Sequence, residues 1–291
     1  MTDTPDLLAV VLTLRPMGGQ GAAGDAAAGD AAAGASPAWW GRAAHALLLD
    51  VLGRADAGLA DRLHDDDGPK PFTVSSLLGR FPGRSLDPQE SYMLRLTALE
   101  RRVAEILLGA AAAGGPLAPG ARLKLDHRPL RVEAATWDGA VQPWAGAAAY
   151  DAFAASHLAA AEPPDRQVTL QFTSPTAFRT QGRHMPLPLP DLVFGSLAER
   201  WNAFAPVAFP AEVRRYAAEC LAISRFDLSS RATPGKEGGL RVGGVGQITY
   251  ATLNYDRYWM SLLHALAAFA LFSGVGVSTA LGMGQCRKIE D

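Results

Sequence analysis

The sequence predicts an α+β fold made of two ferredoxin-like (RRM-like) domains in tandem. The chain has 291 residues, of which 48% are hydrophobic, and this length suits two modest domains. Each half follows the order strand, helix, strand, strand, helix, strand, which is the order of a ferredoxin-like domain. The dipeptide Pro163-Pro164 interrupts the chain between the two repeats. We therefore expect an N-terminal domain over residues 1–160 and a C-terminal domain over residues 161–291.

In the first half, residues 7–16 are rich in β-branched side chains and end in proline, which predicts a strand. Residues 18–37 consist largely of glycine and alanine, so they predict a flexible surface insertion. Apolar residues recur at helical spacing over residues 38–65. Gly53 and Asp56 indicate a break that divides this segment into two helices.

The rest of the first half predicts a strand over residues 71–81 and a long amphipathic helix over residues 85–114. The helix would begin near Asp87-Pro88 and end at Gly114-Gly115. Residues 121–137 alternate between apolar and polar types, which predicts strands or a hairpin. Residues 149–165 are compatible with a helix or with an irregular linker.

The second half repeats this pattern. Strands are predicted over residues 167–178 and 240–253, helices over 191–206, 210–224 and 257–272, and a loop followed by a strand over 282–290. The most apolar stretch, residues 259–277, contains Ser261 and His264 and breaks at Gly274. This pattern predicts a buried helix and not a membrane span.

Composition narrows the classes of function. The two cysteines make neither a disulfide framework nor a zinc site, and the start of the chain carries no signal-peptide pattern, so we expect a reducing cytoplasm. A net charge of −2 argues against a surface that is basic throughout. Residues 1–165 hold 14 basic and 20 acidic residues, whereas residues 166–291 hold 13 and 9. The second half can therefore present a basic face to an anion.

Four glycines stand close to the C-terminus in the stretch GVGVSTALGMGQCR, at Gly274, Gly276, Gly282 and Gly284. The third glycine of a dinucleotide-binding fingerprint is missing, and so is the Gly-Lys-Ser/Thr of a P-loop. Clustered glycines also occur where a backbone approaches phosphates closely, or where a turn packs a helix tightly. Spacing alone leaves these two interpretations level.

Three segments together resemble a known family. The G-x-G-x5-G-x-G loop after a helix is similar to that of the RAMP superfamily of CRISPR-associated RNA-binding proteins. Residues 59–79, LADRLHDDDGPKPFTVSSLLG, and residues 169–204, TLQFTSPTAFRTQGRHMPLPLPDLVFGSLAERWNAF, resemble the pre-crRNA-processing endoribonucleases of the sixth Cas family. The segments lie in the expected order over most of the chain.

The resemblance implies a metal-independent endoribonuclease without a cofactor. It would cleave CRISPR precursor transcripts within the repeat, through attack of a ribose 2′-OH that leaves a 2′,3′-cyclic phosphate and a 5′-hydroxyl. Its partner would be repeat RNA, as a stem-loop or unstructured, and a homodimer or other Cas proteins are compatible with the family, whereas a membrane is not expected. The alternatives are a catalytically silent RAMP subunit that holds guide RNA in an effector complex, and a nucleotide-binding enzyme that uses the loop as a phosphate site.

Such chemistry needs groups that transfer protons and a positive charge beside the phosphorane. His64 and Lys70 match a catalytic His and Lys in one branch of the family, with the separation of six residues retained. His45 lies where other branches place their general acid or base. That first branch also has a tyrosine where this chain has Leu49, which favours His45, and both histidines stay candidates.

The expected RNA contacts lie mainly in the second half. Arg179, Arg183 and His184 are expected on a loop that clamps phosphates. A glycine-rich hairpin carries Arg231, Lys236 and Arg241, and the four loop glycines lead into Arg287 and Lys288. His127, His157 and His264 are interpreted as structural.

Overall fold

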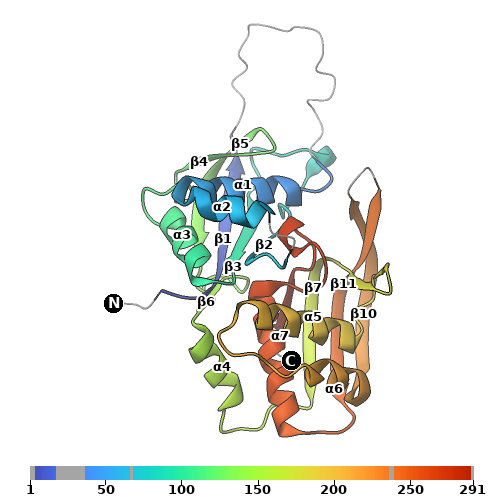
Figure 1. Ribbon diagram of the computed structural model, residues 1–291. Coiled ribbons are helices and arrows are strands. Elements are labelled where there is room, and N and C mark those ends of the chain that lie inside the picture. The colour runs from blue at the N-terminus through green and yellow to red at the C-terminus, as the bar shows by residue number, and fades with distance from the viewer. Residues whose placement is uncertain (1–3, 18–36, 66–67, 236–238, 290–291) are drawn as a thin grey trace, which may run out of the picture.

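The computed structural model describes residues 4–17, 37–65, 68–235 and 239–289. It contains two main antiparallel sheets, one in each half of the chain, and helices lie over one face of each sheet (Figure 1). Strands of the first sheet come from residues 7–148, and those of the second from residues 167–289.

The N-terminal sheet has the strand order β2-β3-β1-β5-β4, with β6 also paired to β1. Its strands are β1 (Leu7–Pro16), β2 (Phe72–Val74), β3 (Tyr92–Ala98), β4 (Arg122–Leu125), β5 (Arg128–Thr136) and β6 (Gly146–Ala148). The helices of this half are α1 (Gly41–Ala55), α2 (Ala57–Asp65) and α3 (Arg101–Ala111). The predicted break between the first two helices is confirmed, because the chain turns out of helical geometry at Asp56.

One long helix predicted over residues 85–114 is wrong. Along the sequence, this segment contains the strand β3, which lies between β1 and β2 in the sheet, followed by the shorter helix α3. The reason is an alternation within the segment: Leu94, Leu96 and Ala98 all join the core beneath the helices, while Arg95 between them faces the other way and lies at a cavity. This period of two predicts a strand, and the helical spacing of the residues that follow obscured it.

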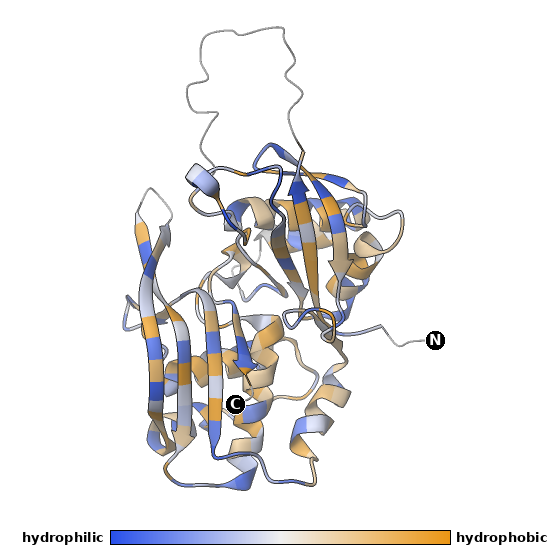
Figure 2. Ribbon diagram, turned by 180° about the vertical axis from the view of Figure 1, so that it is seen from behind, coloured by the Kyte–Doolittle hydropathy of each residue, from blue (hydrophilic) through white to orange (hydrophobic). Residues whose placement is uncertain are grey.

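The C-terminal sheet has the order β10-β11-β7-β12, which repeats the ferredoxin-like arrangement. Its strands are β7 (Gln167–Thr176), β10 (Leu221–Pro234), β11 (Leu240–Thr252) and β12 (Cys286–Ile289). The helices are α5 (Pro190–Phe204), α6 (Glu212–Cys220) and α7 (Arg257–Ser273), while α4 (Tyr150–Leu158) precedes the sheet. The predicted helix over 210–224 ends at Cys220, and the following residues begin β10 instead, an edge strand that is mostly exposed. Hydrophilic and hydrophobic residues are mixed along β10 and β11 (Figure 2).

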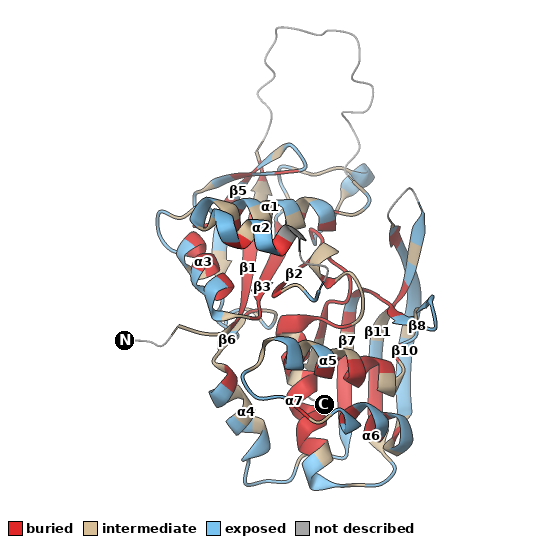
Figure 3. Cartoon of the chain, viewed as in Figure 1, coloured by how far each residue is buried: buried red, intermediate tan, exposed pale blue. Residues whose placement is uncertain are grey.

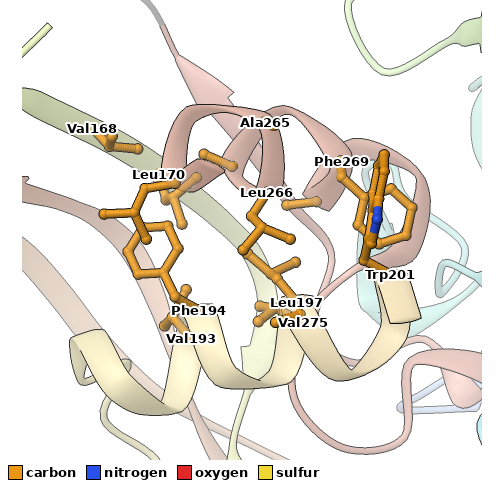
Figure 4. Close-up of a cluster of buried hydrophobic side chains, with 14 of the residues drawn as sticks. Val168, Leu170, Val193, Phe194, Leu197, Trp201, Ala265, Leu266, Phe269 and Val275 are labelled. Atoms are coloured by element: carbon orange, nitrogen blue, oxygen red, sulfur yellow. The ribbon is translucent and has the colours of Figure 1, made fainter. Parts of the chain in front are cut away.

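The main core lies between α5, α7 and the C-terminal sheet (Figure 3). Leu266 and Phe269 of α7 pack toward Leu197 and Trp201 of α5 (Figure 4). Leu7 and Ala9 of β1 belong to the same cluster, so the two halves of the chain share core packing. The expectation of a buried α7 is confirmed, since twelve of its residues are buried. None of the helices in the described part of the chain has the length and hydrophobicity needed to cross a membrane.

Candidate functional site

His45 lies on α1, directly beside the face that packs into the core through Ala44 and Leu48. Its ring is half-buried and lies 5.5 Å from the ring of Phe72. The Nδ1 atom is 2.9 Å from the carbonyl oxygen of Ala280. A carbonyl only accepts hydrogen bonds, so this contact favours the ring tautomer in which Nδ1 carries the hydrogen. In the neutral ring, Nε2 is then the basic nitrogen.

Ala280 belongs to the glycine-rich loop, and this loop is held against the start of α1. The indole Nε1 of Trp39 donates to the carbonyl oxygen of Leu281 at 2.8 Å. Gly41 approaches the same carbonyl so closely that a Cβ atom there would collide with it. Gly282 forms a parallel bridge with Ser75, the residue after β2. The C-terminal half therefore fixes the surroundings of His45 in the N-terminal half.

The four loop glycines serve close packing within the protein. The backbone amides of Gly274, Gly276, Gly282 and Gly284 donate to Ala270 O, Ser196 Oγ, Thr279 O and Pro175 O, respectively. Gly276 and Gly284 also have φ values of +76° and +68°, and a Cβ at either would collide with a backbone carbonyl. This arrangement corresponds to the second interpretation of the glycines, a turn that packs a helix tightly against the rest of the protein. RNA binding by these glycines stays a prediction.

His64 and Lys70 lie at the end of α2 and after it. His64 is within the helix, but its side chain is outside the described part of the structure. Lys70 donates from Nζ to the carbonyl oxygen of Leu63 at 2.6 Å. This bond places a cation at the negative end of α2. The catalytic roles predicted for both residues stay predictions.

The segment with Arg179, Arg183 and His184 was expected to be a loop, but it forms a two-stranded hairpin of β8 (Phe178–Thr180) and β9 (Arg183–Met185). Arg179 pairs with His184 across the two strands, and all three candidate side chains are exposed. A hairpin holds these side chains at a fixed spacing, which suits contacts to phosphates.

Arg231 and Arg241 lie on the long β10–β11 hairpin, as expected, and Lys236 falls outside the described residues. The Arg231 side chain is exposed, and Arg241 donates from Nη1 to Ser278 Oγ of the glycine-rich loop. Sequence reasoning missed Arg42, which is exposed on α1 and donates to the carbonyl oxygen of Gly235 at 2.7 Å. The only feature of the sequence that could have pointed to Arg42 is its position three residues before His45.

Arg287 and Lys288 lie on β12, directly after the loop. The Arg287 Nε donates to Gln171 Oε1 at 2.9 Å, and its guanidinium lies 5.1 Å from the ring centroid of Trp144. Arg287 therefore has partners in both halves of the chain. Both side chains are partly exposed, and RNA contact by either stays a prediction.

Three histidines are interpreted as structural, and each has a place within the fold: one lies in a turn, and the other two contact backbone carbonyl groups. His127 lies at the β4–β5 turn with φ of +63°, and His157 Nδ1 is 2.9 Å from Phe153 O. His264 is 7% exposed, and its Nε2 is 3.0 Å from Asp165 O. No group of three or more His, Cys, Asp or Glu side chains that could hold a metal occurs among the residues described.

His264 gives a prediction for stability against pH. Burial lowers the pKa of this histidine below its ordinary value. As the pH falls through about 6.5, the unfolded chain takes up a proton that the folded chain binds only at lower pH, so stability decreases. We expect His264→Gln, which keeps a donor, to lose less stability between pH 7 and pH 5 than the wild type. Thermal melts across this range check this, and parallel curves for both proteins would contradict it.

Comparison with known proteins extends these observations. The family model for "CRISPR-associated endoribonuclease Cas6" matches residues 170–286. A curated CRISPR-associated endoribonuclease Cas6 of Mycobacterium tuberculosis is 32% identical over 130 residues. That match spans 44% of this chain and 40% of the relative, which is less than half of either protein.

Solved structures match over nearly the whole chain. A Cas6 of Thermus thermophilus in a product complex has a TM-score of 0.74 and 28% identity, and covers 98% of this chain and 100% of that chain. A second Cas6 product complex has a TM-score of 0.71 and 28% identity, and covers 98% of this chain and 99% of that chain. A Cas6-related protein of Pyrococcus furiosus, at 13% identity and a TM-score of 0.57 with 98% and 99% coverage, shares the fold.

Proposed function

We propose that this chain is a CRISPR-associated endoribonuclease like the Cas6 proteins to which it is similar, and that it cleaves CRISPR precursor transcripts within the repeat to give guide RNAs. The observation that carries the proposal is the position of His45. A half-buried histidine is held by the glycine-rich loop at the junction of two ferredoxin-like halves. Relatives with this fold over 97–98% of the chain have been solved as product and substrate-mimic complexes.

The proposed reaction needs only proton transfer and charge. His45 Nε2 takes the proton of a ribose 2′-OH, the 2′-oxygen forms a bond to the adjacent phosphorus, and the bond from phosphorus to the 5′-oxygen breaks. A proton reaches the departing 5′-oxygen, and the products are a 2′,3′-cyclic phosphate and a 5′-hydroxyl. The nucleophile is part of the RNA, so no activated water is required. We assign the proton donor to His64 or Lys70, following the resemblance.

Contacts around His45 support its role as the base. Its Nδ1 is occupied by Ala280 O, so the ring cannot rotate without losing that hydrogen bond. In this chain, the exposed cations Arg42 and Arg231 lie on elements that meet at the loop, and they suit the negative charge of RNA.

The RNA is expected to lie across both halves of the chain. Arg179 and Arg183 on β8–β9 and Arg231 on β10 present exposed cations, and His184 adds an exposed imidazole beside Arg179. A boundary between the two domains near residue 160 is also part of this proposal. Binding through phosphates implies an affinity that falls steeply with salt, and recognition of a repeat implies reading of stem shape and unpaired bases.

A cleavage assay tests the function. Labelled repeat RNA from the organism's own CRISPR array is incubated with the protein in excess chelator, beside an RNA of the same composition in scrambled order. We expect one cut in the repeat RNA and none in the scrambled RNA. Tight binding of the repeat without any cut, with or without added divalent ions, would instead favour the silent RNA-binding subunit.

A further inference from the structure

A cavity of about 520 Å³ lies between the two sheets, and it is separate from the candidate catalytic residues. Its walls come from both halves, including Trp39, Ser75 and Arg95 on one side and Arg231 and Gln285 on the other. None of His45, His64 and Lys70 lines it. The glycine-rich loop contacts His45 through Ala280, and the chain then reaches the cavity at Gln285.

Arg95 is the unusual residue in this wall. It is only 3% exposed, and its Nε and Nη1 atoms donate to Trp144 O at 2.8 Å and to Gln285 Oε1 at 2.6 Å. The Nη2 atom is buried without a hydrogen-bond partner, and no ion pair among the described residues includes Arg95. A buried donor without an acceptor costs about 1–3 kcal/mol, and more when it is charged.

Arg95 keeps its charge despite this burial. Removal from water lowers the pKa of the guanidinium to about 9, which is still above neutral pH. The centroid of the neighbouring Trp144 ring lies 5.5 Å from the guanidinium carbon, so a cation–π interaction offsets part of the cost of burying the charge. The ring provides no hydrogen-bond acceptor for Nη2. A cation that lacks a carboxylate and faces a cavity suits a ligand that brings its own negative charge.

The remaining walls suit a flat, weakly polar group. Trp39, Phe81, Leu78 and Met93 line the cavity, and Leu78 and Met93 are more than a third exposed although both are large and apolar. A volume of this size lies within the range of small-ligand sites, which are mostly apolar with a few placed polar groups. Arg231 adds a second, exposed cation at the rim.

We propose that this cavity binds one nucleotide, with its negatively charged phosphate beside the Arg95 guanidinium and its base packed against the apolar wall around Trp39. The nucleotide is either one unit of a bound RNA strand, distant from the bond that is cut, or a free ribonucleotide. The first source rests on the proposed function, whereas the second does not.

The first arm of the test uses free ligands and requires no cleavage. Nucleoside 5′-monophosphates are titrated into the wild-type protein and followed by calorimetry or by the fluorescence of the tryptophans. We expect saturable binding that is tighter than that of inorganic phosphate or of the nucleosides alone. Arg95→Met is expected to weaken it by about 10–100-fold, the usual value of a hydrogen bond to a charged group. Arg225→Ala, on the same strand as Arg231 but outside the cavity, is the matched control and should bind as the wild type does.

The second arm uses RNA. A repeat RNA with single 4-thiouridine substitutions is irradiated on the protein, and a crosslink to the cavity wall that disappears in Arg95→Met identifies the RNA strand as the source. Binding of free nucleotides without that crosslink identifies the free ribonucleotide. If Arg95→Met does not fold, as judged by its melting curve, Arg231→Ala replaces it in both arms. Absence of nucleotide binding together with absence of a crosslink in the cavity would overturn the proposal, even for a protein that cleaves RNA normally.

Discussion

Replacing His45 with alanine is expected to slow cleavage of repeat RNA by about 10²–10⁴-fold, the usual contribution of a positioned general acid or base. The affinity for RNA should change little, because the ring is half-buried and its Nδ1 is bonded to Ala280 within the protein. Single-turnover rates with excess protein measure the chemical step, and filter binding measures the affinity.

A histidine in similar contacts provides the control. His157 also has Nδ1 at 2.9 Å from a backbone carbonyl oxygen, on α4, away from the loop. His157→Ala should cleave at the wild-type rate. His64→Ala separates the two candidates: if it loses activity while His45→Ala cleaves at the wild-type rate, His45 is not the base, and the assignment made from the structure is wrong.

Gly41→Ala is expected to uncouple the glycine-rich loop from α1. A Cβ atom at this position collides with the carbonyl oxygen of Leu281, next to the Ala280 carbonyl that holds His45. Overpacking of this kind typically costs about 1–3 kcal/mol of unfolding free energy. A displacement of about 1 Å in a catalytic group can also slow a reaction by about 10²-fold. We expect a lower melting temperature and a slower single-turnover rate, with RNA affinity nearly unchanged.

Gly53→Ala is the matched control for that experiment. Gly53 lies on the same helix, and a Cβ there meets only the Cβ of Ala60 at 3.5 Å, an ordinary contact. Alanine is favoured over glycine inside a helix by about 0.5–1 kcal/mol, so this variant should be as stable as the wild type or more so. If Gly41→Ala melts at a lower temperature but cleaves at the wild-type rate, the loop does not position His45.

The sequence predicted the architecture correctly where the spacing of apolar residues was clearly that of a helix or of a strand. The order of strands and helices predicted two ferredoxin-like halves, and both sheets have the corresponding strand order. It failed where two patterns competed. Tyr92–Ala98 alternates as a strand does, but the helical spacing of Arg101–Ala111 follows at once, and the two were merged. It also assigned the first residues of β10 to the preceding helix, because an exposed edge strand needs few apolar residues.

The candidate site depends on contacts that no local pattern contains. His45 and Ala280 are 235 positions apart, and Arg95 and Gln285 are 190 apart. The sequence could mark His45 only through the resemblance to a family. The sequence did not point to Arg95, because the pattern around it was interpreted as a helix. The burial of its Nη2 atom without a hydrogen-bond partner is a property of the folded chain alone. The glycines were found easily, but their amides turned out to bond within the protein.

The end groups of the cleaved RNA test the central claim most directly. Mass spectrometry of the two fragments, made in excess chelator, distinguishes attack by the 2′-OH from attack by water. We predict a 2′,3′-cyclic phosphate on the upstream fragment and a 5′-hydroxyl on the downstream fragment. A 3′-hydroxyl with a 5′-phosphate would contradict the account, because the nucleophile would then be water and not the ribose beside His45.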